Sequence, residues 1–396
     1  MPRLRDVVRG PWRAVAVLGV SQILAWGTLF YPPVLMMPLI AADLGWSIAF
    51  AMSGLSIALA TGGLVAPIVG RLIDRHGGAP VMTAGSLIGA AGLFALAQTS
   101  HRAAWLGIWM VLGVALSASL YDAAFATLGR IFGPASRRPI TLLTFAGGFA
   151  STVSWPTTQV LLDRFGWRAT YLVFAGLLVF VAAPLHAFAL PRRRAELAAP
   201  PAGAPPPAGV LPARGLPFVL VATGFAAYSF VPSGMSAHLL AIFGRAGIDA
   251  GTVVMIGALF GPCQVASRLL EFAFGGGTHP LAIARAAVSL VMCAFVVLAV
   301  AGISPLPAAA FAILFGVSNG LITIARGTVP LTMFGAAGYG RLVGRLAAPW
   351  LAVQAAAPLV LAFVIEKASD AAALGVTALF ATIALMSFLA IRAPKH

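Results

Sequence analysis

Long apolar runs constrain this chain more than any other feature of its sequence. Of its 396 residues, 60% are hydrophobic and 9% are charged, whereas about a quarter of the residues in a soluble domain are charged. A membrane-spanning helix needs about 20 apolar residues. About twelve such runs can be read, at roughly 14–40, 47–69, 79–98, 103–128, 140–161, 169–190, 216–243, 251–271, 281–302, 306–333, 343–365 and 371–391. We therefore predict an all-α membrane protein with twelve transmembrane helices and no strands of the alternating pattern found in membrane barrels.

The formal net charge of +15 indicates orientation rather than nucleic-acid binding, because basic residues concentrate in the cytoplasmic loops of membrane proteins. With both termini in the cytoplasm, 18 of the 25 Lys and Arg residues fall in cytoplasmic segments and 5 in outer segments. The first run is too long for the apolar region of a signal peptide, so we expect it to be retained. The prediction is a multi-pass protein of the inner (plasma) membrane, with both termini cytoplasmic.

A segment near the midpoint divides the apolar runs into two groups of six. Residues 191–215 contain three consecutive arginines and several prolines among Ala and Gly, a composition typical of a semi-extended linker. We predict a six-helix bundle at 1–190, a cytoplasmic linker at 191–215 and a second six-helix bundle at 216–396.

Two short matches relate the halves to each other. Arg71-Leu72-Ile73-Asp74 is matched by Arg268-Leu269-Leu270-Glu271, 197 residues later, and Phe132-Gly133 is matched by Phe334-Gly335, 202 residues later. Two matches at nearly one offset indicate the duplication of a six-helix unit. The two bundles should therefore be pseudo-symmetric, as in transporters built from parallel repeats.

A charged loop joins the second and third runs, with the sequence Gly70-Arg71-Leu72-Ile73-Asp74-Arg75-His76-Gly77-Gly78. This G-R-L-x-D-R-x-G-G spacing resembles the signature loop of major facilitator superfamily transporters. The resemblance implies that the Asp caps a helix start and pairs with Arg across the two halves, latching one conformation. The expected latch residues are Gly70, Arg71, Asp74, Arg75, Gly77 and, from the second repeat, Glu271.

At finer grain, residues 130–168 resemble the bacterial relatives of the monocarboxylate transporters. The resemblance rests on Phe132-Gly133, Arg137-Arg138, Gly147-Gly148 and the stretch Asp163-Arg164-Phe165-Gly166-Trp167-Arg168. In that family, an Asp of the eighth helix and an Arg one turn later serve proton coupling and carboxylate binding. Here Arg268 matches the Arg, but Gln264 stands where the Asp would be, which makes Asp122 the better candidate for coupling. The first-helix Lys of animal members is also absent, and residues 147–156 do not reproduce the fifth-helix motif of drug antiporters.

Ionisable residues within apolar runs are costly to insert and are therefore functional candidates. Asp122, in the fourth run, could be a protonatable carboxyl facing a central cavity, or a capping or gate residue near Arg130. Its neighbour Tyr121 is a further candidate for substrate binding. Arg268 either belongs to a latch at the cytoplasmic mouth or binds an anion.

A polar stripe marks the tenth run, because Asn319, Thr323 and Arg326 are spaced i, i+4, i+7 and share one helical face. Arg suits the bidentate recognition of carboxylates, although a structural Arg paired with a carbonyl or with Asp122 is the other interpretation. The repeat alignment places Asp122 opposite position 324, so we predict that Asp122 and Arg326 face each other.

Other candidates are weaker. His238 and Tyr228 in the seventh run could relay protons or only pack between helices. The Trp155-Pro156 pair indicates a kink, and Trp26-Gly27 and Tyr31-Pro32-Pro33 indicate bends that could line a cavity or only shape it.

These features favour a secondary active transporter that moves a small organic anion, monocarboxylate-like, by alternating access, with or without coupling to protons. The alternative is an exporter of a drug or metalloid by proton antiport. An enzyme would need clustered His, Cys or acidic ligands, and a P-loop for ATP is absent from the sequence. We expect no cofactor and no metal. The expected partners are a small-molecule substrate and the lipid bilayer, with no nucleic acid, and the expected state is a monomer.

Overall fold

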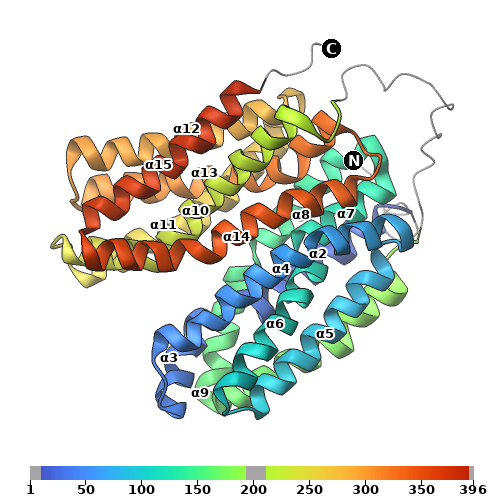
Figure 1. Ribbon diagram of the computed structural model, residues 1–396, viewed down its shortest axis with the longest axis horizontal. Helices are drawn as coiled ribbons and strands as arrows, with labels where there is room; N and C mark the ends of the chain where they lie inside the picture. Colours follow the sequence, from blue (N-terminus) through green and yellow to red (C-terminus); the bar gives the residue numbers. More distant parts are fainter. Residues whose placement is uncertain (1–9, 193–210, 392–396) are drawn as a thin grey trace. The chain divides into compact units, whose positions relative to one another are not determined.

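The computed structural model describes residues 10–192 and 211–391. Every element assigned within them is helical. The amino-terminal elements are α2 (Arg13–Ala25), η1 (Trp26–Phe30), α3 (Pro33–Leu44), α4 (Ile48–His76), α5 (Gly78–Gln98), α6 (Arg102–Ser119), α7 (Tyr121–Phe132), η2 (Gly133–Ser136), α8 (Arg137–Gly148), α9 (Ala150–Leu177), η3 (Leu178–Ala182) and η4 (Leu185–Ala189). The carboxy-terminal elements are α10 (Gly215–Arg245), α11 (Ala250–Phe274), η5 (Gly275–Gly277), α12 (Pro280–Ala301), α13 (Pro305–Phe334), α14 (Tyr339–Lys367) and α15 (Asp370–Ala390) (Figure 1).

Ten helical stretches of the described residues are long and apolar enough to cross a membrane. One of them runs over 88 residues, from Arg102 to Ala189. As one straight helix it would be about 130 Å long, several times the thickness of the hydrocarbon core. The chain instead turns at Gly133 and Gly166, where φ is 56° and 74°, so this stretch supplies three crossings. The predicted twelve-helix fold is confirmed.

The crossings are numbered here as spans 1 to 12 along the chain. Span 1 comprises α2, η1 and α3, span 2 is α4 and span 3 is α5. Span 4 comprises α6 and α7, span 5 comprises α8 and α9 up to Gly166, and span 6 comprises the remainder of α9 with η3 and η4. Spans 7 to 12 are α10 to α15 in order.

The helices form two compact units. Among the described residues, unit 1 takes 10–192 together with Ala336–Ala348, the start of α14, and unit 2 takes 211–335 and 349–391. Most of the predicted linker, residues 193–210, lies outside the described residues. The division into domains at 191–215 therefore stays a prediction.

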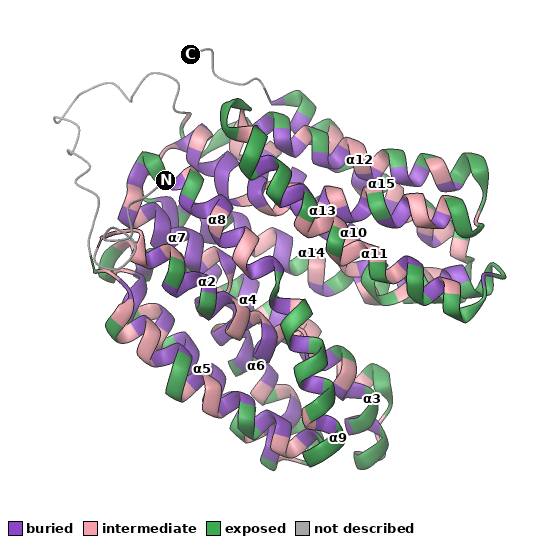
Figure 2. Ribbon diagram, turned by 180° about the vertical axis from the view of Figure 1, so that it is seen from behind, coloured by how far each residue is buried: buried purple, intermediate pink, exposed green. Residues whose placement is uncertain are grey.

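Unit 1 is held together by helices that approach closely at small residues. In α4, Gly54 faces the indole of Trp109, and in α6, Gly113 lies against the backbone of Ala58. A Cβ at either glycine would overlap these neighbours, so the close packing of α4 on α6 requires them. Figure 2 shows α7 almost wholly buried within this unit.

Unit 2 is built from α10 to α13, the later part of α14 and α15. The helix α13 packs along both α11 and α12, and α10 packs along α15 (Figure 1). Phe230 of α10 and Phe380 of α15 stack with ring centroids 3.9 Å apart. The predicted repeat is visible in the backbone, because Gly335, with φ of 79°, directly follows the last residue of α13, as Gly133 directly follows the last residue of α7. Both positions have a positive φ, which glycine adopts readily.

Candidate functional site

The carboxylate of Asp74 lies at the amino-terminal end of α14. Its Oδ1 accepts a hydrogen bond from the backbone N–H of Gly340 at 2.9 Å, and its Oδ2 accepts one from the N–H of Arg341 at 2.7 Å. The first N–H groups of a helix have no partner within the helix, and the helix dipole favours negative charge there. Asp74 therefore caps α14, as the resemblance implied, within unit 1.

Close backbone contact accompanies this cap. A Cβ on Gly70 would overlap the carbonyl oxygen of Gly340, and one on Gly344 would overlap the carbonyl oxygen of Ala66. The small residues in the signature loop and in α14 therefore let the two helices touch through their backbones.

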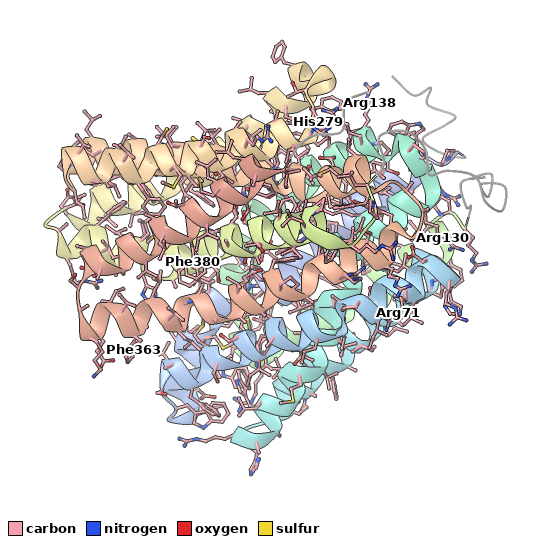
Figure 3. All side chains as sticks on the ribbon, turned by 45° about the horizontal axis from the view of Figure 1, so that its top comes forward. Arg71, Arg130, Arg138, His279, Phe363 and Phe380 are labelled. Atoms are coloured by element: carbon pink, nitrogen blue, oxygen red, sulfur yellow. The ribbon has the colours of Figure 1, made fainter. Side chains whose placement is uncertain are left out.

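Arg130 of α7 also contacts the signature loop. Its guanidinium donates to the backbone carbonyl of Asp74, and its Nη2 donates to the carbonyl of Arg75 at 3.5 Å. These carbonyls belong to the last turn of α4, where cationic donors are favourable. Figure 3 shows Arg130 and Arg71 at the same end of unit 1. The side chains of Arg71 and Arg75 are exposed.

Span 4 is broken in its middle, directly before the two candidates Tyr121 and Asp122. Leu120 is extended, with φ of −86° and ψ of −168°, and separates α6 from α7. The buried amide of Gln22 donates to the carbonyl of Ser119 at 2.7 Å. This hydrogen bond satisfies a backbone group at the break, where an unsatisfied carbonyl would be costly in a membrane. The sequence contains no Gly or Pro at this position, so neither the break nor the role of Gln22 was predicted.

Tyr121 and Asp122 occupy the first turn of α7. Asp122 is half-buried and is the acidic residue of that turn. Tyr121 is buried, and its hydroxyl donates to the carbonyl of Thr144 at 3.4 Å.

Two arginines of unit 2 lie along α13. Arg268 is 3% exposed, and its Nη2 donates to Oγ1 of Thr323 at 3.4 Å. The helices α11 and α13 come this close because Gly320 lies against the backbone of Gln264. The structure thus brings together Gln264, Arg268 and Thr323, all of which the sequence singled out.

The second arginine is Arg326, one turn after Thr323. Its guanidinium carbon lies 4.4 Å from the centroid of the Trp350 ring, a cation–π contact. Asn319 is half-buried on the same face of α13. Trp350 was missed, because nothing in its local sequence indicates that α14 packs beside Arg326. Two guanidinium groups therefore lie at adjacent turns of α13, that of Arg326 itself and that of Arg268, which bonds to Thr323.

Tyr228 and His238 lie in packing contacts of unit 2. The hydroxyls of Tyr228 and Ser318 are 2.8 Å apart, and Ser318 donates to the carbonyl of Ala287 at 2.6 Å. His238 Nε2 lies 2.9 Å from the carbonyl oxygen of Pro358. Both side chains join neighbouring helices, which favours the packing interpretation over a proton relay.

A buried histidine that the sequence analysis passed over lies in unit 1. His186 is 0% exposed, and its Nδ1 is 3.1 Å from Oγ of Ser86. It belongs to η4, a π-helical turn, and such turns are frequent at functional sites. Its position in an apolar run, with no polar residue at helical spacing, gave no signal.

The remaining candidates are Glu271 and the predicted pair of Asp122 and Arg326. Glu271 is 9% exposed at the end of α11 and lies against Gly275. Asp122 and Arg326 belong to different units, so their pairing stays a prediction. Within the described ranges, no three His, Cys, Asp or Glu side chains gather as ligands of a metal.

Comparison with known proteins decides the family. Residues 16–325 match the model described as Major Facilitator Superfamily. The chain belongs to this superfamily. Among solved structures, this superfamily member is similar over 98% of its length to 99% of the human organic anion transporter MFSD10, with a TM-score of 0.70 and 17% identity. It is similar over 95% of its length to 97% of the fucose:proton symporter FucP in the outward conformation, with a TM-score of 0.72 and 14% identity. Identities this low show the fold alone.

Curated relatives of this superfamily member include monocarboxylate transporters. Monocarboxylate transporter 3 of Rattus norvegicus is 36% identical over 142 residues, which cover 34% of this chain and 27% of the relative. Monocarboxylate transporter 11 of Homo sapiens is 27% identical over 311 residues, which cover 77% of this chain and 59% of the relative. The match therefore spans between about a quarter and three fifths of these relatives.

Proposed function

We propose that this member of the superfamily is a secondary transporter that moves a small organic anion, monocarboxylate-like, across the inner membrane by alternating access. The observation that carries the proposal is the pair of guanidinium groups, Arg268 and Arg326, on spans of unit 2 in a chain with 9% charged residues. Cations placed in spans mark substrate or ion pathways. The names of the curated relatives and of MFSD10 point to the same class of substrate.

Arg326 is the proposed carboxylate-binding residue. The ring of Trp350 covers one face of its guanidinium, and a guanidinium pairs with a carboxylate through its edge in a bidentate geometry. Arg268 adds a second positive charge one turn away, through Thr323. Gln264 beside it cannot exchange a proton, so we assign any proton coupling to Asp122.

The proposed cycle needs a latch, and Asp74 supplies it. The cap on α14 depends on a carboxylate that meets two N–H groups at 2.7 and 2.9 Å. We propose that this cap forms in one state of the cycle and opens in the other, with both chain termini in the cytoplasm.

Flux measurements test the function. Purified protein in proteoliposomes should exchange labelled monocarboxylates such as lactate or benzoate, and Arg326→Ala should abolish this exchange. Arg102→Ala is the matched control, because it removes the same charge from an exposed residue that lies over Phe50. The absence of flux for every organic anion by the wild-type protein, or full flux in Arg326→Ala, would overturn the proposal.

A further inference from the structure

A row of aromatic rings crosses spans 1, 4 and 5 of unit 1. The ring centroid of Trp26 lies 5.1 Å from that of Tyr121 and 5.9 Å from that of Tyr31. Tyr31 in turn lies 6.3 Å from Trp155. We call these four residues the ring row. They come from three spans that are distant in sequence, so the fold assembles the row.

The rings are held in place by hydrogen bonds. Nε1 of Trp26 donates to Oε1 of Gln22 at 3.1 Å, and Gln22 is itself anchored at the break in span 4. Tyr121 bonds to the carbonyl of Thr144. A ring surface fixed before binding loses little conformational entropy when a ligand arrives.

Span 5 is fixed against span 1 by a separate contact. Ser154 donates through Oγ to the carbonyl of Gly27 at 2.8 Å, and a Cβ on Gly27 would lie 3.5 Å from the Cβ of Ser154. This contact holds Trp155, the next residue, beside Tyr31. Gly27 also follows Trp26 directly, so one contact positions Trp26 of span 1 and Trp155 of span 5.

Part of the ring row is accessible. Trp155 is 48% exposed, and Trp26 and Tyr31 are half-buried. The exposed face of α9 that carries Trp155 also carries Thr152, three residues before it, and Gln159, four residues after it. Polar side chains are unfavourable against lipid tails. The accessible edge of the row therefore borders water rather than hydrocarbon.

We propose that the ring row is a subsite for the flat apolar part of the transported anion, so that the substrates are aryl carboxylates rather than short aliphatic acids. This inference rests on the proposed function, because it names the class of organic anion that the transporter carries. Aromatic rings favour other aromatic rings in stacked or edge-to-face contact beyond the gain from buried area. The rings form a row rather than a cage, which favours a flat ring over a quaternary ammonium group.

The test compares two acids of similar size. Binding of benzoate and of cyclohexanecarboxylate to the purified full-length protein is measured by calorimetry, with acetate and choline as further probes. We expect benzoate to bind more tightly than cyclohexanecarboxylate, by up to about tenfold. Trp155→Leu should remove this preference, and Trp155→Phe should retain most of it. Trp155 is exposed, so neither variant opens a cavity in the core.

A control variant and the possible outcomes separate this inference from the proposed function. Phe188→Leu alters a residue of η4 that is 83% exposed and outside the ring row, and it should leave the ratio of the two affinities unchanged. Carboxylate binding with no aryl preference, or a preference that survives Trp155→Leu, overturns this inference and leaves the proposed function standing. Binding of choline in place of benzoate assigns the row to cations and also overturns it. Failure of every carboxylate to bind overturns both proposals.

Discussion

Arg168 donates a 2.7 Å hydrogen bond to the carboxylate of Asp43 and ties the start of span 6 to the end of span 1. Unit 2 has the same tie with the charges exchanged, because Arg245 at the end of span 7 pairs with Asp370 at the start of span 12 at 2.6 Å. Residues 43 and 245, and residues 168 and 370, are each 202 positions apart. This offset equals that of Gly133 and Gly335, so the two ion pairs are independent support for the duplication.

Exchanging the charges in unit 1 tests this equivalence. Asp43→Arg alone should lower the thermal unfolding temperature, because it leaves two cations side by side. Adding Arg168→Asp should recover most of the loss and copy the polarity found in unit 2. The pair is nearly half exposed, so we expect both shifts to be small. A double variant no more stable than Asp43→Arg would contradict the equivalence.

Asp74→Asn should impair turnover far more than substrate binding. The amide has one acceptor oxygen where the carboxylate offers two, so one of the N–H groups of Gly340 and Arg341 loses its partner. The maximal rate of flux should fall strongly while the dissociation constant for the anion stays near that of the wild type. His76→Asn, an exposed change in the same loop, is the control. Unimpaired flux at equal expression in Asp74→Asn would count against the latch.

Asp122→Asn should abolish accumulation driven by a pH gradient and leave counterflow exchange at least partly intact. The amide cannot take up or release a proton, but it keeps the size of the side chain and one acceptor oxygen at the start of α7. The measurement compares both modes in the same proteoliposomes. Accumulation that persists in the variant places the coupling residue elsewhere or indicates a facilitator.

Arg326→Lys should retain little anion binding even though the charge is kept. Lys is a point charge without the planar fork that meets both carboxylate oxygens, and it stacks less well on Trp350. We expect an affinity loss of at least about tenfold, measured by calorimetry on purified protein. Wild-type affinity in Arg326→Lys would mean that charge alone, and not the fork, recognises the anion.

The spans could be predicted because a lipid environment demands long apolar helices, and that demand is local in sequence. The break at Leu120 could not. It follows from Gln22, almost a hundred residues earlier, which supplies the hydrogen bond that the broken helix needs. The contact between Arg326 and Trp350 likewise joins two different helices, and no local sequence pattern predicts it.

The sequence identified Tyr228 and His238 as polar residues within a span, but it could not predict their role. A polar side chain in a span can serve a substrate or satisfy a neighbouring backbone group, and the sequence does not distinguish the two. Pro358 in α14 has no N–H, so the carbonyl of Gln354 lacks its helical donor. Ser233 of α10 donates to that carbonyl at 2.7 Å. Ser233 therefore compensates for Pro358, whereas the hydroxyl of Tyr228 contacts Ser318 of α13 and His238 contacts the carbonyl of Pro358 itself.

The assignment of Ala336–Ala348 to unit 1 bears on any attempt to produce the halves as separate fragments. If the polypeptide is cut between the two groups of six spans, the amino-terminal fragment lacks residues 336–348, which contact Gly70. Tyr339 then also loses its contact with Gly129. Such a piece should be recovered in folded form only when the other fragment is synthesised alongside it. Complementation of the two fragments should also be sensitive to bulk at position 340, where glycine alone leaves room.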